Sequence, residues 1–178
     1  GYLCQHHYLG LRVVGENLKY LVQAHDGRDV ACLLFGAAAW KVAARDRFLG
    51  WTWAQRAQGL GQVANNTRFL ILPWVRVPGL ASHVLSRVVR RLSEDWQHKY
   101  GHPVWLVETF VERDRFAGTA YQAAHWLRVG QTQGRGRQGS DPRVRSASIK
   151  DVFVYPLHRH FRQHLQGVGA PPPPLEVA

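Results

Sequence analysis

Arg68-Phe-Leu-Ile-Leu-Pro-Trp-Val-Arg-Val77, the Pro78-Gly79 turn and Leu80-Ala-Ser-His-Val-Leu85 together decide the fold. The first run is apolar, which predicts a buried strand, and the last run opens an amphipathic helix. A second apolar run at 104–111 predicts another strand, followed by a short helix within 118–126 and a strand at 127–130. This order places a helix N-terminus, which is a natural site for anions, at the end of a buried strand.

The helix is predicted over 80–100, because its apolar residues recur at intervals of three and four. Gly101-His-Pro103 ends it. The buried face is predicted to carry Ala81, Val84, Leu85, Val88, Val89, Leu92 and Trp96.

Elements on either side complete an α/β fold. A hairpin is predicted from strands at 17–24 and 29–37 joined by Asp26-Gly27, the usual signal for a tight turn. We also expect a stretch at 45–53 packed across an edge, a short helix at 53–63 ended by Asn65-Asn66, a strand at 149–157 and a helix at 158–166. The predicted architecture is a mixed, mostly antiparallel sheet flanked by helices.

The length and the 46% hydrophobic content suit one compact domain, predicted over 1–166. Four consecutive prolines make 167–178 a stiff linker, which we expect to lead to a downstream domain. No apolar run is long enough to span a membrane. The two cysteines give no disulfide framework, which fits a cytoplasmic setting.

The formal net charge of +11 favours a polyanionic partner such as DNA, RNA or a phosphate-rich cofactor. Glycine and arginine alternate in 130–145, which predicts a mobile basic loop that approaches phosphates closely. The alternative is a solvated loop without a partner. The predicted nucleic-acid contacts are Arg135, Arg137, Arg143 and Arg145 in this loop, with Arg87, Arg90 and Arg91 on the helix.

Two motifs resemble the GNAT superfamily of N-acetyltransferases. Gly79-Leu-Ala-Ser-His-Val-Leu85 is similar to the end of the loop that holds the acetyl-CoA pyrophosphate, and Tyr121-x-x-x-His125-Trp126 is similar to Tyr-x-x-x-Gly-Phe, with His125 in place of glycine. The resemblance implies a GNAT-like fold, acetyl-CoA contacts at Gly79, Ala81 and Ser82, and Tyr121 as a general acid.

A longer resemblance spans nearly the whole chain and points to the bacterial family that includes the DruA component of Druantia anti-phage systems. It implies a DNA-related role in defence or in mobile elements, near or fused to transposase-like domains. The motifs that carry it are His7-Tyr-Leu-Gly10, Arg45-Asp-Arg-Phe-Leu-Gly-Trp51, Asn65-Asn-Thr-Arg-Phe-Leu-Ile-Leu72, Glu108-Thr-Phe-Val111, Gly134-Arg-Gly-Arg137 and Lys150-Asp-Val-Phe-Val-Tyr-Pro-Leu157.

Glu108 stands inside an apolar strand, where a carboxylate is costly unless it is paired. Its pKa rises toward that of a general base, or it forms a structural ion pair with Arg68 or Arg115. Tyr121 is either the general acid or a packed tyrosine bonded to a backbone carbonyl. The candidate catalytic residues are His7, Asp46, Asn66, Glu108 and Tyr121.

The histidines at 158, 160 and 164 have no cysteine or acidic partner at zinc-like spacing, so no metal site is predicted. Three functions remain open. The first is a DNA-binding or DNA-processing module, and the second is an acyl-CoA-dependent N-acyltransferase acting on a nucleic acid or a basic metabolite. The third is a protein–protein module whose charge is incidental.

Overall fold

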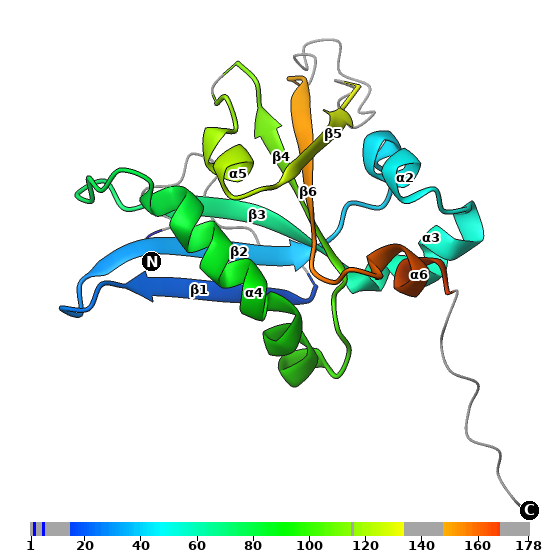
Figure 1. The fold of residues 1–178 in the computed structure, drawn as a ribbon, viewed down its shortest axis with the longest axis horizontal. Coiled ribbons are helices and arrows are strands. Elements are labelled where there is room, and N and C mark those ends of the chain that lie inside the picture. Colours follow the sequence, from blue (N-terminus) through cyan, green and yellow to red (C-terminus); the bar gives the residue numbers. More distant parts are fainter. Residues whose placement is uncertain (1, 3–4, 6–14, 115, 134–147, 168–178) are drawn as a thin grey trace, which may run out of the picture.

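A six-stranded mixed sheet forms the centre of the computed structural model, which describes residues 2, 5, 15–114, 116–133 and 148–167. The strand order is β1-β2-β3-β4-β6-β5 (Figure 1). All neighbours pair antiparallel except β3 and β4, which are parallel. The strands are β1 (Asn17–Gln23), β2 (Asp29–Ala37), β3 (Val63–Ile71), β4 (Leu106–Glu112), β5 (Leu127–Gln131) and β6 (Lys150–Pro156).

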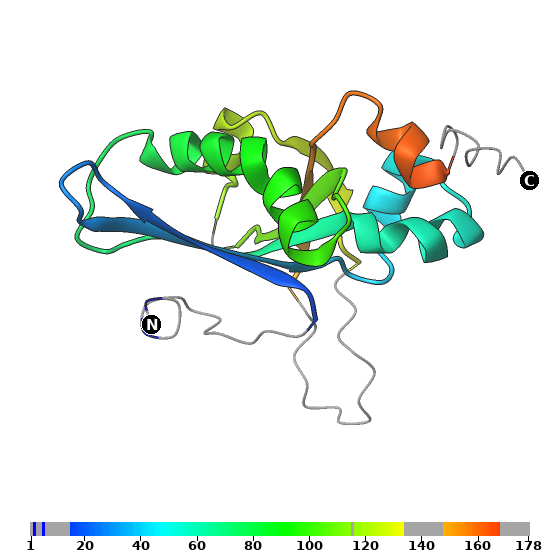
Figure 2. The ribbon, with the colours of Figure 1, turned by 90° about the horizontal axis from the view of Figure 1, so that it is seen from below.

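Helices lie across the sheet and at one end of it. Figure 1 shows the long helix α4 crossing the strands β1, β2 and β3, with α2, α3 and α6 grouped beyond one end of the sheet. Figure 2 shows α4 and the sheet as separate layers. The helices are α2 (Ala43–Leu49), α3 (Trp53–Gly59), the 3-10 turn η1 (Leu60–Gln62), α4 (Leu80–Tyr100), α5 (Thr119–Ala123) and α6 (Phe161–Gln166). The predicted α/β class with a mostly antiparallel sheet is confirmed.

The main core lies between α4 and the sheet. Leu85, Leu92 and Trp96 are almost completely buried there, and they pack with Leu33 and Phe35 of β2. Helix α4 begins and ends at the predicted residues, and Gly101 ends it with a left-handed φ of 79°. Burial of a Leu or Phe side chain contributes about 1.5–3 kcal/mol, so this apolar stripe fixes the helix on the sheet.

A second core holds the helices α2, α3 and α6 together at the end of the sheet. Its buried members are Leu49, Trp51, Val63, Leu106, Val154, Phe161 and Leu165. Gly59 of α3 lies so close to α6 that an added Cβ would stand 2.7 Å from the Leu165 carbonyl oxygen. This contact fixes how closely α3 and α6 approach each other.

Three predicted segments differ from the structure. Strand β3 runs over 63–71 and not over 68–77, because Pro73 cannot donate to a sheet and the chain turns away after Leu72. Asn65 and Asn66 therefore lie inside a strand instead of ending a helix. Most of the stretch expected to pack across an edge forms α2, and a capping box between Thr52 and Gln55 begins α3.

Within the part of the chain that the structure describes, no helix combines the length and the apolar character needed to cross a membrane. Residues 168–178 lie outside the described part, so the linker and the downstream domain stay predictions.

Candidate functional site

A β-bulge in β3 creates the site. Leu34 of β2 pairs with Arg68, whereas the next residue pairs with Asn66, so Thr67 is the extra residue of β3. The Asn66 amide nitrogen donates to the carbonyl oxygens of Leu34 (3.2 Å) and Arg68 (3.0 Å), and the Thr67 hydroxyl also donates to Leu34 (3.3 Å). A bulge bends the strand that carries it and increases its local twist. The Asn66 side chain thus stabilises the bend.

Beyond the bulge, β3 and β4 separate. Their parallel pairing covers only Val63–Asn65 against Leu106–Glu108. Two side chains from across the opening then donate hydrogen bonds to Asn66. The Thr109 hydroxyl donates to the Asn66 backbone oxygen (2.9 Å), and the Tyr121 hydroxyl donates to the Asn66 amide oxygen (2.7 Å). Asn66 therefore joins β3, β4 and α5 where the two strands part.

The opening holds a cleft of about 380 Å³, a volume within the range of ordinary ligand pockets. Apolar side chains form most of its walls, and the polar side chains stand mainly where the strands part. Glu112 is the only carboxylate among the described residues that line it, and its side chain lies 3.4 Å from Lys150 Nζ. The lining residues are Asn66, Thr67, Phe69, Ile71, Ala81, Thr109, Phe110, Val111, Glu112, Phe116, Ala117, Gly118, Thr119, Ala120 and Tyr121.

The first turn of α4 reaches this cleft through Ala81. Gly79 begins the helix with a φ of 73°, a conformation that suits glycine. Amides in the first turn of a helix have no intrahelical acceptor. The Leu80 amide bonds to the Val77 carbonyl, but no backbone acceptor in the described part of the chain pairs with the amides of Ala81 and Ser82. These two N–H groups and the helix dipole favour an anion.

Glu108 lies apart from the cleft, which it does not line. Its carboxylate accepts from Arg45 Nη1 (2.8 Å) and from the Ala39 amide (2.9 Å), and both charged side chains are fully buried. Arg45 is therefore the partner that the structure shows for Glu108, and Arg115, one of the two arginines considered from the sequence, lies outside the described residues. Burial raises the pKa of Glu108, and the Arg45 charge opposes that rise.

Asp46 extends the same buried network. It accepts from Arg45 (2.8 Å), from Arg56 (3.0 Å) and from the Trp51 indole (3.1 Å). Burial alone would raise the pKa of Asp46, but the hydrogen bond and charge of Arg45, together with the hydrogen bonds of Arg56 and Trp51, outweigh it and hold the pKa below its usual value. A carboxylate with three donors and a lowered pKa is a poor proton acceptor.

The candidate catalytic residues thus fall into two groups. Asn66 and Tyr121 meet in the cleft, whereas Glu108 and Asp46 meet at Arg45. The hydroxyl of Tyr121 donates to the side-chain amide oxygen of Asn66. His7 and the four predicted loop arginines at 135, 137, 143 and 145 lie outside the described residues.

Sequence reasoning missed three residues. Arg45 carries no signal that it is buried, and Thr109 reads as an ordinary strand residue. Arg76, which is exposed, stands three residues before Gly79 and gives an Arg-x-x-Gly spacing there, although we began the resemblance to the acetyl-CoA loop only at Gly79. On α4, Arg87 and Arg90 are exposed.

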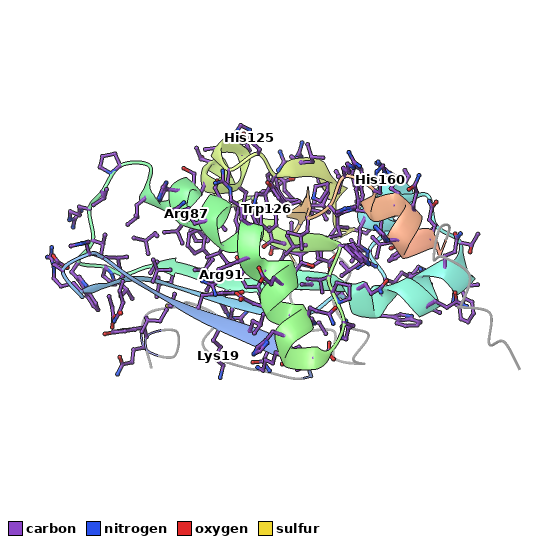
Figure 3. The ribbon with its side chains drawn as sticks, turned by 60° about the horizontal axis from the view of Figure 1, so that its bottom comes forward. Lys19, Arg87, Arg91, His125, Trp126 and His160 are labelled. Carbon is purple, nitrogen blue, oxygen red and sulfur yellow. The ribbon has the colours of Figure 1, made fainter. Side chains whose placement is uncertain are left out.

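Arg91 of α4 is paired with Asp95, which lies 2.7 Å away. Figure 3 shows Arg91 and Arg87 on this one helix.

Among the described residues, no group of three or more histidine, cysteine or acidic side chains is placed to hold a metal ion.

A sequence model of the family described as Druantia protein DruA matches residues 1–144. The chain belongs to the DruA family. A comparison with curated proteins gave no match.

Among solved structures, this DruA-family chain is similar to the spermidine N-acetyltransferase of Vibrio cholerae. In its complex with CoA and spermine, that enzyme gives a TM-score of 0.51 at 8% identity, covering 79% of this chain and 66% of that one. A point mutant of the same enzyme gives 0.52 at 8% identity, covering 86% and 70%. The chain thus spans about two thirds of these neighbours. At this identity the likeness shows the fold alone, and the predicted GNAT-like fold is confirmed.

Proposed function

We propose that the cleft between β3 and β4 binds an acyl-CoA, and that the chain acts as an N-acyltransferase in a bacterial anti-phage defence protein of the cytoplasm. The observation that carries this proposal is the cleft itself. Its apolar walls suit the pantetheine arm of CoA, and the amides of Ala81 and Ser82, which have no backbone acceptor in the described part of the chain, stand where phosphates would lie. The same fold in a structure that holds CoA supports the proposal.

Acetyl-CoA would supply an acyl group on a thioester. Arg76 is exposed and precedes the first turn of α4, so it would pair with phosphate oxygens beside the amides of Ala81 and Ser82. In the transfer, the amine nitrogen of the acceptor would attack the acyl carbon, so that the C–N bond forms as the C–S bond of the thioester breaks. The Tyr121 hydroxyl, which its bond to Asn66 holds in place, would protonate the leaving CoA thiolate and recover a proton from the attacking amine. Glu108 stays out of the reaction in this proposal, because it is buried against Arg45.

The experiment is a calorimetric titration of the full chain with CoA. Ala81→Glu places a carboxylate at the rim of the cleft, and we expect CoA affinity to fall at least tenfold, about 1.4 kcal/mol. Ala57→Glu makes the same change on the exposed side of α3 and should leave the affinity unaltered. No CoA binding by the unmutated chain, or equal binding by both variants, would refute the proposal.

We also propose that the chain binds or processes DNA, with a transposase-like or defence protein as its partner. The net charge of +11 and the exposed Arg87 and Arg90 of α4 support this second proposal. Replacing the four loop arginines at 135, 137, 143 and 145 with alanine should weaken binding to a DNA duplex and lower its salt dependence by about one for each phosphate contact that is lost. Unchanged affinity in that variant would remove the loop from the DNA site.

A further inference from the structure

Two tryptophans at the helical end of the molecule are held in the solvent. Trp40 is 56% exposed and Trp53 is 69% exposed. The Arg56 guanidinium lies 5.7 Å from the ring centroid of Trp40, and Trp53 lies three residues before Arg56 on the same face of α3. The Thr52 capping box fixes the first turn of α3, which carries Trp53. The Arg56 guanidinium covers part of the Trp40 ring, and both indoles still present a large exposed area to the solvent.

The charge around these indoles is almost entirely positive. Asp46 is the one acidic residue in 38–62, and there is none in 157–167. Because Asp46 is paired with Arg45 and Arg56, it neutralises none of the exposed cations. The exposed cations of α2, α6 and the segments that precede these helices are Lys41, Arg47, Arg159 and Arg162.

Helix α6 adds further rings to the same end. The rings of Phe48 and Phe161 stack at 5.9 Å, and the Arg162 guanidinium lies within 5 Å of both centroids. Trp105 stacks on His164 at 4.1 Å. Helix α6 joins its neighbours through hydrogen bonds to α2 and α3, so Phe48 and Phe161 belong to one group of packed helices, and Trp105 precedes β4 beside it. Figure 3 shows His160 beside this helix.

Exposed cations beside two exposed indoles match the chemistry of an unpaired nucleic-acid strand. Its phosphates need cations, and its bases stack on rings without regard to sequence. A duplex offers the phosphates, but its base faces are already stacked. We propose that this end of the molecule binds single-stranded nucleic acid, with bases stacked on Trp40 and Trp53. The inference rests on the second proposed function, that the chain binds DNA, and is independent of the cleft.

The experiment measures fluorescence anisotropy of a labelled oligothymidylate of about 15 nucleotides, and of a duplex of equal length, with the full chain. Trp40→Ala and Trp53→Ala should each lower the affinity for the single strand about tenfold, or about 1.4 kcal/mol, and change the affinity for the duplex little. Trp53→Phe should restore most of the affinity, because phenylalanine also stacks.

Trp74→Ala is the matched control, because this tryptophan is 54% exposed but lies in the loop between β3 and α4. It should leave both affinities unaltered. The stacking site would be overturned if Trp40→Ala and Trp53→Ala lowered the affinities for the single strand and the duplex equally, or if neither variant lowered the affinity for the single strand. Either result would leave the DNA proposal standing. Failure of the unmutated chain to bind either probe would instead refute the DNA proposal itself.

Discussion

Replacing Glu108 with alanine tests whether this carboxylate is structural or catalytic. Its oxygens lie 2.8 Å from Arg45 Nη1 and 2.9 Å from the Ala39 nitrogen, and neither charged side chain is exposed. Removing one partner of a buried pair leaves the other charge without compensation, which costs about 3–5 kcal/mol. Since a domain is stable by only about 5–15 kcal/mol, we expect the Glu108→Ala variant to fold marginally.

Urea unfolding followed by tryptophan fluorescence provides the measurement. Glu112→Ala is the matched control, because Glu112 lies on the same strand and its carboxylate pairs with Lys150 at 3.4 Å. Both side chains of this pair are partly exposed. Its loss should cost about 1 kcal/mol or less. The double variant Arg45→Met with Glu108→Leu replaces the pair with apolar groups and should regain part of the lost stability, because Asp46 loses Arg45 but keeps Arg56 and the Trp51 indole as donors.

A structural role for Glu108 is refuted if the unfolding free energy of the Glu108→Ala variant lies within about 1 kcal/mol of that of the unmutated chain. A normal unfolding free energy combined with a lost transferase rate would return Glu108 to the role of general base.

Three further predictions concern local geometry. His125→Gly should stabilise the fold by about 1 kcal/mol in urea unfolding, because His125 has a φ of 63°. Gly118→Ala should lower the melting temperature, at a cost of about 2 kcal/mol, since φ is 70° and the new Cβ would stand 2.8 Å from the Phe153 ring. Glu16 raises the pKa of His102, so their bond should stabilise the chain below about pH 6.5 and be lost as pH rises through the raised pKa. His102→Gln should remove that pH dependence of unfolding, and an unchanged profile would contradict the assignment.

The sequence predicts the elements whose pattern is local. Helix α4 is correct to the residue because its apolar period and Gly101 are both local signals. The hairpin of β1 and β2 follows from Asp26-Gly27 in the same way. The family motifs also place Tyr121 and Ala81 at one site, and the structure brings both to the cleft.

The remaining features depend on contacts between distant residues. The composition of Asn65-Asn66 signals the end of a helix. In the structure, however, the Asn66 side chain stabilises a bulge by donating to the carbonyl oxygen of Leu34, which lies 32 residues away in the sequence. Arg45 is charged and looks exposed, but its partner Glu108 lies 63 residues away. His125 replaces a glycine of the GNAT pattern, and the structure shows the left-handed backbone that the glycine would favour.

The most direct test of the account is a crystal structure of the chain grown with CoA. We predict that the pantetheine arm lies between β3 and β4 beside Asn66 and Tyr121, with the phosphates at the amides of Ala81 and Ser82. CoA bound only at the basic helical end, or a cleft that stays free of CoA at saturating concentration, would contradict the account.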